Sequence, residues 1–150
     1  MAKVFLGLGS NVGDRAGFLT KARDIIRSKV GVIIRESAIL GTESWGFKSD
    51  PFLNQVILID TILEPLDLLS QLNLIEKELG RFEKTDTTRS EIEYHDRTID
   101  IDILIYDDLK WESEQLTLPH PDMHKRDFVM IPLAEIADPE LITKIKTGNY

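Results

Sequence analysis

The sequence predicts an α+β fold of the ferredoxin-like kind, an antiparallel sheet with two helices on one face. Three observations predict it: apolar runs short enough for strands, two longer segments with apolar residues at helical spacing, and their order β-α-β-β-α-β. The length of 150 residues favours a single domain over residues 1–150. Extra strands and a helix are expected after this unit.

The first half of the chain supplies three strands and a helix. Residues 4–8 form a short apolar run that predicts the first strand. Asp14 can cap a helix that runs to about residue 29, because Phe18, Ala22 and Ile26 lie at helical spacing. Residues 32–40 are β-branched and predict one strand, and residues 52–61 predict the next.

The second half supplies the other helix and the clearest strand. Pro65 opens the helix, since its missing N–H needs no partner in a first turn, and Gly80 ends it. Residues 98–106 are the clearest strand of the chain. We expect a weaker pair of strands that ends near residue 118, a short helix around 128–137 and then a polar tail.

Composition excludes several classes of protein. The chain has 26 acidic and 18 basic residues, a net charge of −8, which argues against sequence-independent binding of nucleic acid or anionic membranes. No cysteine is present, which excludes a disulfide scaffold, a zinc–cysteine site and a cysteine nucleophile. No apolar run approaches the roughly 18 residues that span a bilayer, and the N-terminus lacks signal-peptide features. We therefore expect a cytoplasmic domain.

A glycine-rich run follows the first predicted strand. Gly7, Gly9 and Gly13 approximate the dinucleotide-binding pattern G-x-G-x-x-G, but the third glycine comes one position late and no long α/β alternation follows. The run is better interpreted as a turn between strand and helix that requires small residues.

Two aspartates stand out in the strand at 98–106. Alternation along this strand places Asp100 and Asp102 on one face, roughly 6.6 Å apart. The other face carries Ile99, Ile101, Ile103 and Ile105. Oxygen ligands without His or Cys favour Mg²⁺, and two ions about 3.5–4 Å apart would suit displacement at phosphorus. The alternative is a strand with one solvated face, although strands usually avoid Asp.

Cationic and hydrogen-bonding residues complete a set of groups suited to phosphoryl transfer. They are Arg81, Arg97, His120 and Arg126. His120 lies between two prolines, which restrict the backbone around it. Binding a ligand through the imidazole would therefore cost little conformational entropy. The alternative for His120 is an ordinary surface residue of a loop.

Four motifs together resemble the 6-hydroxymethyl-7,8-dihydropterin pyrophosphokinase family of folate biosynthesis. They are residues 9–11 (GSN), 52–54 (FLN), 97–102 (RTIDID) and 116–120 (LTLPH). The resemblance covers nearly the whole chain. It implies an ATP-dependent diphosphotransferase that moves the pyrophosphoryl group of ATP to the hydroxymethyl oxygen of the pterin, releases AMP and uses two Mg²⁺ ions.

The resemblance also implies roles for individual residues. Asp100 and Asp102 match the metal-binding carboxylates, and the catalytic set is Arg81, Arg97, Asp100, Asp102 and His120. The ATP-binding positions are Leu69, Asn73, Glu76, Arg81, Arg97, Ile103, Leu116, Thr117, His120 and Arg126. The pterin-binding positions are Thr42, Glu43, Trp45, Phe52, Asn54, Tyr94 and Phe128, with Phe52 and Phe128 stacking on the ring. The small molecules are the only implied partners, and the expected state is a monomer or weak homodimer.

The chain departs from the family pattern near residue 94. Tyr94 stands where the family usually has a Trp-Gly-Pro-like run, and Glu83 stands where a second basic residue is common. The segment 82–96 is longer than in compact members. We expect it and segment 41–51 to act as lids over bound substrates.

The charge distribution along the chain predicts that phosphate binding depends on a bound metal ion. Residues 76–108 contain five basic and eleven acidic residues and so hold three quarters of the net charge. Two Mg²⁺ ions would invert the local field. Two alternatives remain: a different Mg²⁺-dependent phosphotransferase, or a non-catalytic ferredoxin-like ligand-binding module.

Overall fold

A computed structural model describes residues 1–42, 52–80 and 98–148 of the chain. Its centre is an antiparallel sheet of β1 (Ala2–Ser10), β2 (Val32–Glu36), β3 (Leu40–Thr42), β4 (Phe52–Thr61) and β5 (Asp100–Tyr106). The strand order is β2-β4-β1-β5, and β3 also pairs with β4. The expected antiparallel sheet in a mixed α/β fold is therefore confirmed.

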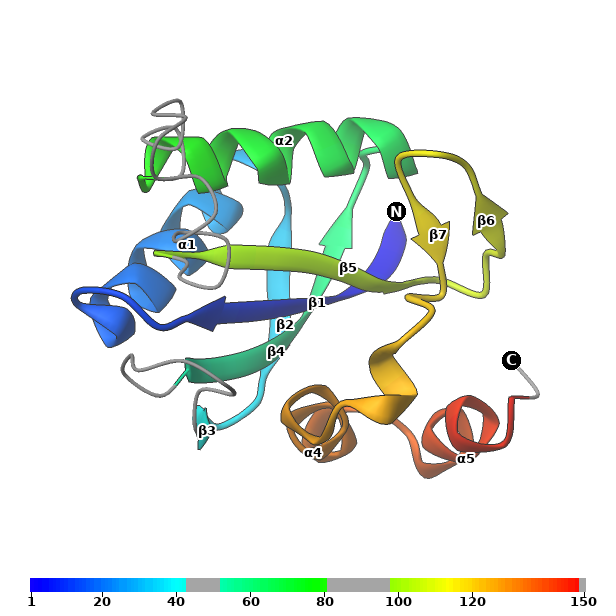
Figure 1. The fold of residues 1–150 in the computed structure, drawn as a ribbon. Coiled ribbons are helices and arrows are strands. Elements are labelled where there is room, and N and C mark those ends of the chain that lie inside the picture. Colours follow the sequence, from blue (N-terminus) through cyan, green and yellow to red (C-terminus); the bar gives the residue numbers. More distant parts are fainter. Residues whose placement is uncertain (43–51, 81–97, 149–150) are drawn as a thin grey trace.

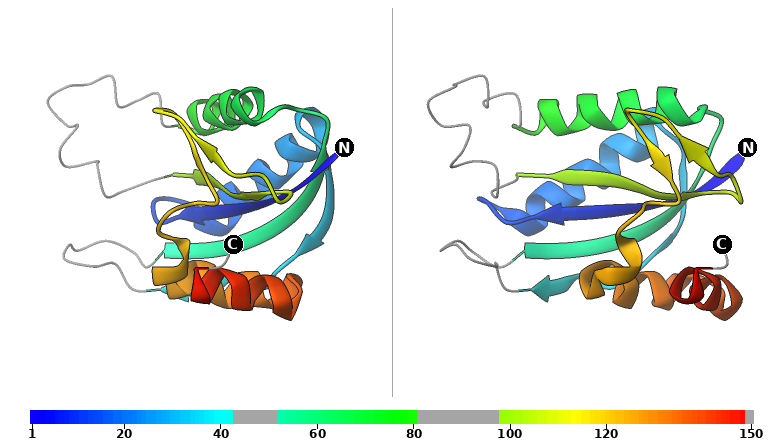
Figure 2. Two further views of the ribbon diagram at one scale, coloured as in Figure 1. Left: turned by 90° about the vertical axis from the view of Figure 1, so that its right-hand side faces the viewer. Right: turned by 45° about the vertical axis from the view of Figure 1, so that its right-hand side comes forward.

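Helices cover both faces of this sheet (Figures 1 and 2). Helices α1 (Arg15–Lys29) and α2 (Pro65–Glu78) lie on one face, as expected. Helices α4 (Asp127–Ile136) and α5 (Pro139–Thr147) lie on the other. A small hairpin of β6 (Trp111–Glu112) and β7 (Thr117–Leu118) and a 3₁₀ turn, η2 (Met123–Lys125), join β5 to α4.

The prediction of a single strand over residues 32–40 was wrong, because Ser37 interrupts the ladder. The Val56 N–H donates to Ser37 Oγ at 3.0 Å, so a side chain takes the place of a backbone partner. The Gln55 side chain donates to the Ser37 carbonyl at 2.7 Å. These local bonds separate β2 from β3.

The prediction of a polar tail was also wrong, since residues 139–147 form helix α5. Pro139 stands at the start of the helix, and Gly148 ends it with a φ of 74°. Ile145 is buried, and Leu141 and Ile142 pack against the same apolar cluster. The spacing of these three residues is that of one helical face, which the charged residues between them obscure in the sequence.

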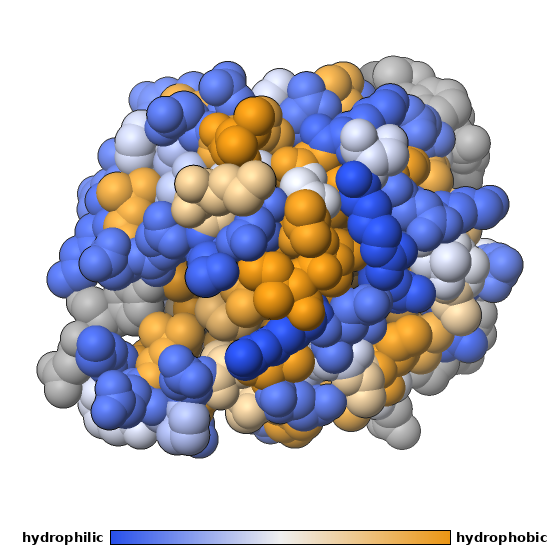
Figure 3. Space-filling view, turned by 180° about the vertical axis from the view of Figure 1, so that it is seen from behind, coloured by the Kyte–Doolittle hydropathy of each residue, from blue (hydrophilic) through white to orange (hydrophobic). Residues whose placement is uncertain are grey.

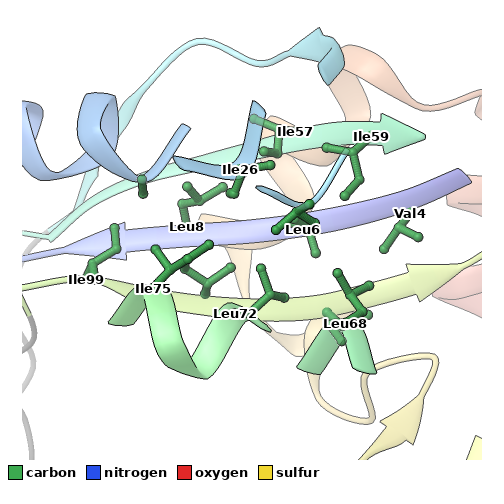
Figure 4. Close-up of a cluster of buried hydrophobic side chains, with 14 of the residues drawn as sticks. Val4, Leu6, Leu8, Ile26, Ile57, Ile59, Leu68, Leu72, Ile75 and Ile99 are labelled. Carbon is green, nitrogen blue, oxygen red and sulfur yellow. The ribbon is translucent and has the colours of Figure 1, made fainter. Parts of the chain in front are cut away.

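The larger apolar core lies between the sheet and helices α1 and α2 (Figure 4). Val4, Leu6 and Leu8 point from β1 toward Ile26 of α1 and Leu72 of α2. The predicted cap of α1 is confirmed, because the Asp14 carboxylate accepts a hydrogen bond from the Gly17 N–H at 3.1 Å. This core fixes one face of β1 and β5 and leaves the opposite face for other side chains.

A second apolar cluster lies beneath α4 and α5, and it corrects the expected pattern of β5. Leu6 pairs with Ile103, but Phe5 pairs with Ile105, so Leu104 is an extra residue in β5. The bulge moves Ile105 into the second cluster, away from the face of Ile101 and Ile103. The expectation that all four isoleucines share one face was therefore wrong for Ile105.

The open edge of the sheet at β2 leaves apolar side chains on the surface. Val32 and Ile34 are exposed there, and Figure 3 shows apolar side chains gathered in the middle of the face opposite to that of Figure 1. No helix in the described ranges is both long enough and apolar enough to cross a membrane.

The two sides of α2 provide a matched test of the larger core. Leu72 is fully buried, whereas Leu74 on the same helix is 53% exposed. Leu72→Ala should lower the free energy of unfolding by about 2–5 kcal/mol through lost burial and the cavity left behind. Leu74→Ala should change it by no more than about 0.5 kcal/mol. Urea unfolding measures both, and equal losses would contradict this assignment of the core.

Candidate active site

Strand β5 places the two predicted aspartates on the same face. Its other face is anchored by Ile101 and Ile103, which are buried in the larger core. Asp100 and Asp102 therefore point to the side opposite α1 and α2, and both are half-buried. The period of two predicted from the sequence holds over this part of the strand.

The neighbouring strand carries glycines opposite both carboxylates. Gly9 pairs with Asp100, and Gly7 pairs with Asp102. On its other side Gly9 pairs with Asn54 of β4, which is 5% exposed. One row across the sheet thus runs Asn54, Gly9, Asp100, and the middle position has no side chain. Sequence reasoning missed this row, although the spacing of Gly7 and Gly9 already placed both on one strand face.

One backbone hydrogen bond holds His120 next to β5, and a second bond, within its own loop, orients the imidazole. Its own N–H donates to the carbonyl of Leu104 at 2.8 Å, and the Asp122 N–H donates to its Nδ1 at 3.2 Å. Because Nδ1 accepts, the neutral ring carries its proton on Nε2. The imidazole therefore has a donor available on the side away from Asp122.

The electrostatics of His120 connect it to two other predicted site residues. Burial lowers the pKa of His120 below its usual value, and the Arg126 guanidinium lowers it further. The carboxylates of Asp122 and Asp100 act in the opposite direction. The structure thus brings His120 close to both Asp100 and Arg126.

Two aromatic rings lie on this face of the sheet on the side of β4, across β1 from the carboxylates. Phe52 opens β4, is half-buried and shares the strand face of Asn54. Phe128 lies in the first turn of α4, 37% exposed, with the Arg126 guanidinium 5.8 Å from the ring centroid. Helix α4 packs against β4, so both rings belong to the same side of the sheet.

Glu76, one of the predicted nucleotide-binding positions, also has a structural role. Its side chain is buried, and its Oε2 accepts a hydrogen bond from the Ile101 N–H at 2.8 Å. Ile101 lies between Asp100 and Asp102 in the chain. Glu76 therefore ties the end of α2 to the segment of β5 that carries both carboxylates.

The positions expected around the adenine lie where α2 and β7 flank β5. Ile103 and Leu116 are buried in the larger core, and Leu69 packs against it. Asn73 is exposed on α2, and Thr117 pairs with Glu112 in the small hairpin. Their role in nucleotide binding stays a prediction.

Several predicted residues lie outside the described part of the chain. They are Glu43, Trp45, Arg81, Tyr94 and Arg97, together with both predicted lid segments beyond Thr42 and Gly80. Thr42 ends β3, and only its backbone is described. Gly80 and Thr98, which flank the second segment, lie next to each other: a Cβ at Gly80 would be 3.2 Å from Thr98 Oγ1.

The chemistry of the carboxylate pair fits a hard divalent cation whose shell is completed by other oxygen ligands. In the described ranges no group of three or more His, Asp or Glu side chains could hold a metal ion. Mg²⁺ usually binds through one or two carboxylates together with water and substrate phosphates. Asp100 and Asp102 suit that mode.

The chain matches a family of known activity. A family model described as 7,8-dihydro-6-hydroxymethylpterin-pyrophosphokinase (HPPK) matches residues 5–138. A 2-amino-4-hydroxy-6-hydroxymethyldihydropteridine pyrophosphokinase from Porphyromonas gingivalis is 45% identical and covers 99% of both chains. One from Aquifex aeolicus is 40% identical and covers 97% of this chain and 86% of its own.

Solved structures agree in fold. A crystal structure of an HPPK-DHPS in complex with substrates has a TM-score of 0.69 at 14% identity, covering 99% of this chain. One of Plasmodium falciparum HPPK-DHPS, with SDX-DHP, has a TM-score of 0.68 at 16% identity. This chain spans 43% and 44% of those longer chains.

The family match over residues 5–138 and the full-length relatives define an ATP-dependent pyrophosphokinase. The chain belongs to the 7,8-dihydro-6-hydroxymethylpterin-pyrophosphokinase family.

The lowered pKa of His120 predicts a pH dependence of stability. Because the folded state binds this proton more weakly than the unfolded state, the contribution to stability is complete above about pH 6.5 and is lost as the pH falls through the folded pKa. Urea unfolding between about pH 5 and about pH 8 should show this loss of stability. In the variant His120→Gln, the part of the pH dependence that comes from His120 should disappear. An NMR titration that gives His120 a pKa above its usual value would contradict the prediction.

The bond from Ile101 to Glu76 predicts a local effect on β5. Glu76→Ala leaves the buried Ile101 N–H without its acceptor and should cost about 1–3 kcal/mol while speeding hydrogen exchange of that amide. Glu76→Gln keeps an acceptor oxygen and should keep the amide protected. The control is Glu78→Ala, an exposed position on the same helix, which should have little effect. Unchanged exchange at Ile101 in Glu76→Ala would contradict the assignment.

Proposed function

We propose that the sheet face carrying Asp100, Asp102 and Asn54 binds the phosphates of ATP and 6-hydroxymethyl-7,8-dihydropterin side by side. The pyrophosphoryl group of ATP moves to the hydroxymethyl oxygen, giving AMP and the pterin diphosphate in folate biosynthesis. The observation that carries the proposal is the single row of Asn54, Gly9 and Asp100, which joins a position suited to a heterocycle to one suited to a metal.

Asp100 and Asp102 would hold Mg²⁺, and two ions are expected. Bound there, Mg²⁺ would neutralise phosphate charge and polarise the transferred group. The chain's net charge of −8 makes this neutralisation necessary, because ATP brings about four further negative charges. Phosphate binding should therefore depend on the metal.

The basic residues would act on the phosphates. His120 offers its Nε2–H as a neutral donor, in an orientation set by the Asp122 N–H. Arg126 lies close enough to shift the pKa of His120 and would contact the same polyphosphate chain. Arg81 and Arg97 are proposed as further phosphate clamps, on the family resemblance alone. Such contacts hold the attacking oxygen and the phosphorus in line and stabilise the charge that develops.

The pterin would stack between Phe52 and Phe128 and hydrogen-bond to Asn54. Aromatic faces bind a flat heterocycle by offset stacking, and a buried carboxamide supplies the orientation. The remaining proposed contacts, carried over from the family, are Thr42, Glu43, Trp45 and Tyr94. The adenine end is proposed to lie beside α2 and β7, at Leu69, Asn73, Glu76, Ile103, Leu116 and Thr117.

We further propose that residues 1–150 form one domain of the ferredoxin-like type. The support is the order β1-α1-β2-β4-α2-β5, the strand order β2-β4-β1-β5 and the placement of α1 and α2 on one face. Helices α4 and α5 are additions to this unit that bring Phe128 to the site.

The reaction is tested by incubating the protein with ATP, Mg²⁺ and 6-hydroxymethyl-7,8-dihydropterin and measuring nucleotide products. AMP that forms only when the pterin is present supports the proposal. Formation of ADP would indicate a different phosphotransferase, and no turnover in a folded protein would indicate a ligand-binding module; either result contradicts it.

The carboxylate pair has a separate test. Asp100→Asn and Asp102→Asn should each reduce Mg²⁺-dependent turnover by about 100-fold or more, since a metal ion supplies several kcal/mol of transition-state stabilisation. The thermal midpoint should change little, because both side chains are half-buried on the face away from the larger core. Asp108→Asn, exposed just beyond β5, is the control. Loss of the fold in both variants would instead indicate a structural role.

A further inference from the structure

Gly9 is the next-to-last residue of β1 and pairs with a residue of the neighbouring strand on each side, yet its backbone conformation does not require glycine. Glycine weakens a strand interior, because it adds conformational entropy to the unfolded chain and packs no side chain. Gly9 and Gly7 are not among the residues with positive φ, so neither is required by backbone conformation. What distinguishes the two positions is the space above them.

A side chain at position 9 would meet Asn54. A Cβ there would lie 3.0 Å from Asn54 Oδ1, closer than ordinary van der Waals contact, and 3.8 Å from Phe52 Cδ1. At position 7 a Cβ would lie 3.5 Å from its nearest neighbour, Leu104 Cδ1, which is ordinary contact. The Asn54 carboxamide thus occupies the space that any other residue at position 9 would need.

The direction of the Asn54 side chain follows from the strand order. Strand β1 lies between β4 and β5, so an oxygen above Gly9 leans from β4 toward the strand that carries Asp100. Asn54 is buried, so its carboxamide has few alternative positions. A shift of a few tenths of an ångström at this oxygen would reorient whatever it binds.

We propose that Gly9 is a specificity-determining positioning residue for the pterin. By lacking a side chain, it lets the Asn54 carboxamide lie across β1 and present the heterocycle toward the carboxylate pair. The inference rests on the proposed function, in which Asn54 hydrogen-bonds the pterin. Gly9 itself acts through Asn54 and takes no part in the chemistry.

The test compares Gly9→Ala with the matched variant Gly7→Ala. Gly9→Ala should raise the KM for the pterin about tenfold, the effect of one lost hydrogen bond in a binding site, and change the KM for ATP by less than about twofold. Gly7→Ala should change the pterin KM far less. Equal effects of the two variants, or equal effects on both substrates, would overturn the proposal.

A double-mutant cycle with Asn54→Ala shows whether Gly9 acts through Asn54. In the Asn54→Ala background, Gly9→Ala should have little further effect, because the atom that it displaces is gone. If Gly9→Ala raised the pterin KM by the same factor in the wild-type chain and in the Asn54→Ala variant, the proposal would be overturned. If Gly9→Ala alone fails to fold, the double variant should fold; failure of the double variant would also count against it.

Two readouts separate this inference from the proposed reaction. Titration of pterin fluorescence in the presence of Mg²⁺ and a non-hydrolysable ATP analogue measures binding without turnover. No pterin binding by the wild-type chain would refute the proposed function, whereas equal binding by wild type and Gly9→Ala would refute only the role of Gly9. In the ligand-free protein, NMR signals of the Asn54 side-chain amide should move in Gly9→Ala and stay in place in Gly7→Ala.

Discussion

Two carboxylates on one face of a single strand repel each other, and strands ordinarily avoid aspartate. The positions of Asp100 and Asp102 must therefore be imposed by their surroundings. Ile101 and Ile103 supply the first constraint, because their burial fixes which face of β5 turns toward the helices α1 and α2. Glu76 supplies the second through the Ile101 N–H. The strand segment that carries the pair is thus held by contacts of Ile101 and Ile103 on the opposite face and of the Ile101 N–H.

The same strand also positions His120, the donor proposed to contact the phosphates. His120 is tied to β5 by its bond to the Leu104 carbonyl, next to the bulge that directs Ile105 into the second cluster. Burial and Arg126 lower the pKa of His120, and the Asp122 N–H selects the neutral tautomer with the proton on Nε2. The proposed metal ligands, Asp100 and Asp102, and the proposed phosphate donor, His120, are therefore all held by strand β5. Helices α4 and α5 pack against the same face of the sheet as Leu104 and Ile105 of β5, and α4 carries Phe128.

Local patterns predicted much of this arrangement. Alternation along residues 98–106 placed both aspartates on one face, and Asp14, Pro65 and Gly80 marked helix ends because capping depends on neighbouring residues. Features that depend on distant partners could not be predicted in this way. The bulge at Leu104 depends on pairing with β1, and the break at Ser37 depends on Val56 of another strand.

The role proposed for Gly9 could not be predicted from the sequence for the same reason, since the row from Asn54 to Asp100 joins three strands that lie far apart in the sequence. In the sequence Gly9 has the pattern of a simple turn glycine. The hydrogen bond from the Ile101 N–H to Glu76 was likewise hidden, because the sequence does not show which residue of β5 lies beside this end of α2. In both cases the missing information is the register between strands and helices.

The central claim is that Asp100 and Asp102 bind a divalent cation together with the phosphates of ATP. The most direct measurement is the anomalous diffraction signal of Mn²⁺ in crystals soaked with and without a non-hydrolysable ATP analogue. Manganese peaks beside both carboxylates, strong only when the analogue is present, are the expected result. Manganese held elsewhere in the presence of the analogue, with none at this pair, would contradict the claim.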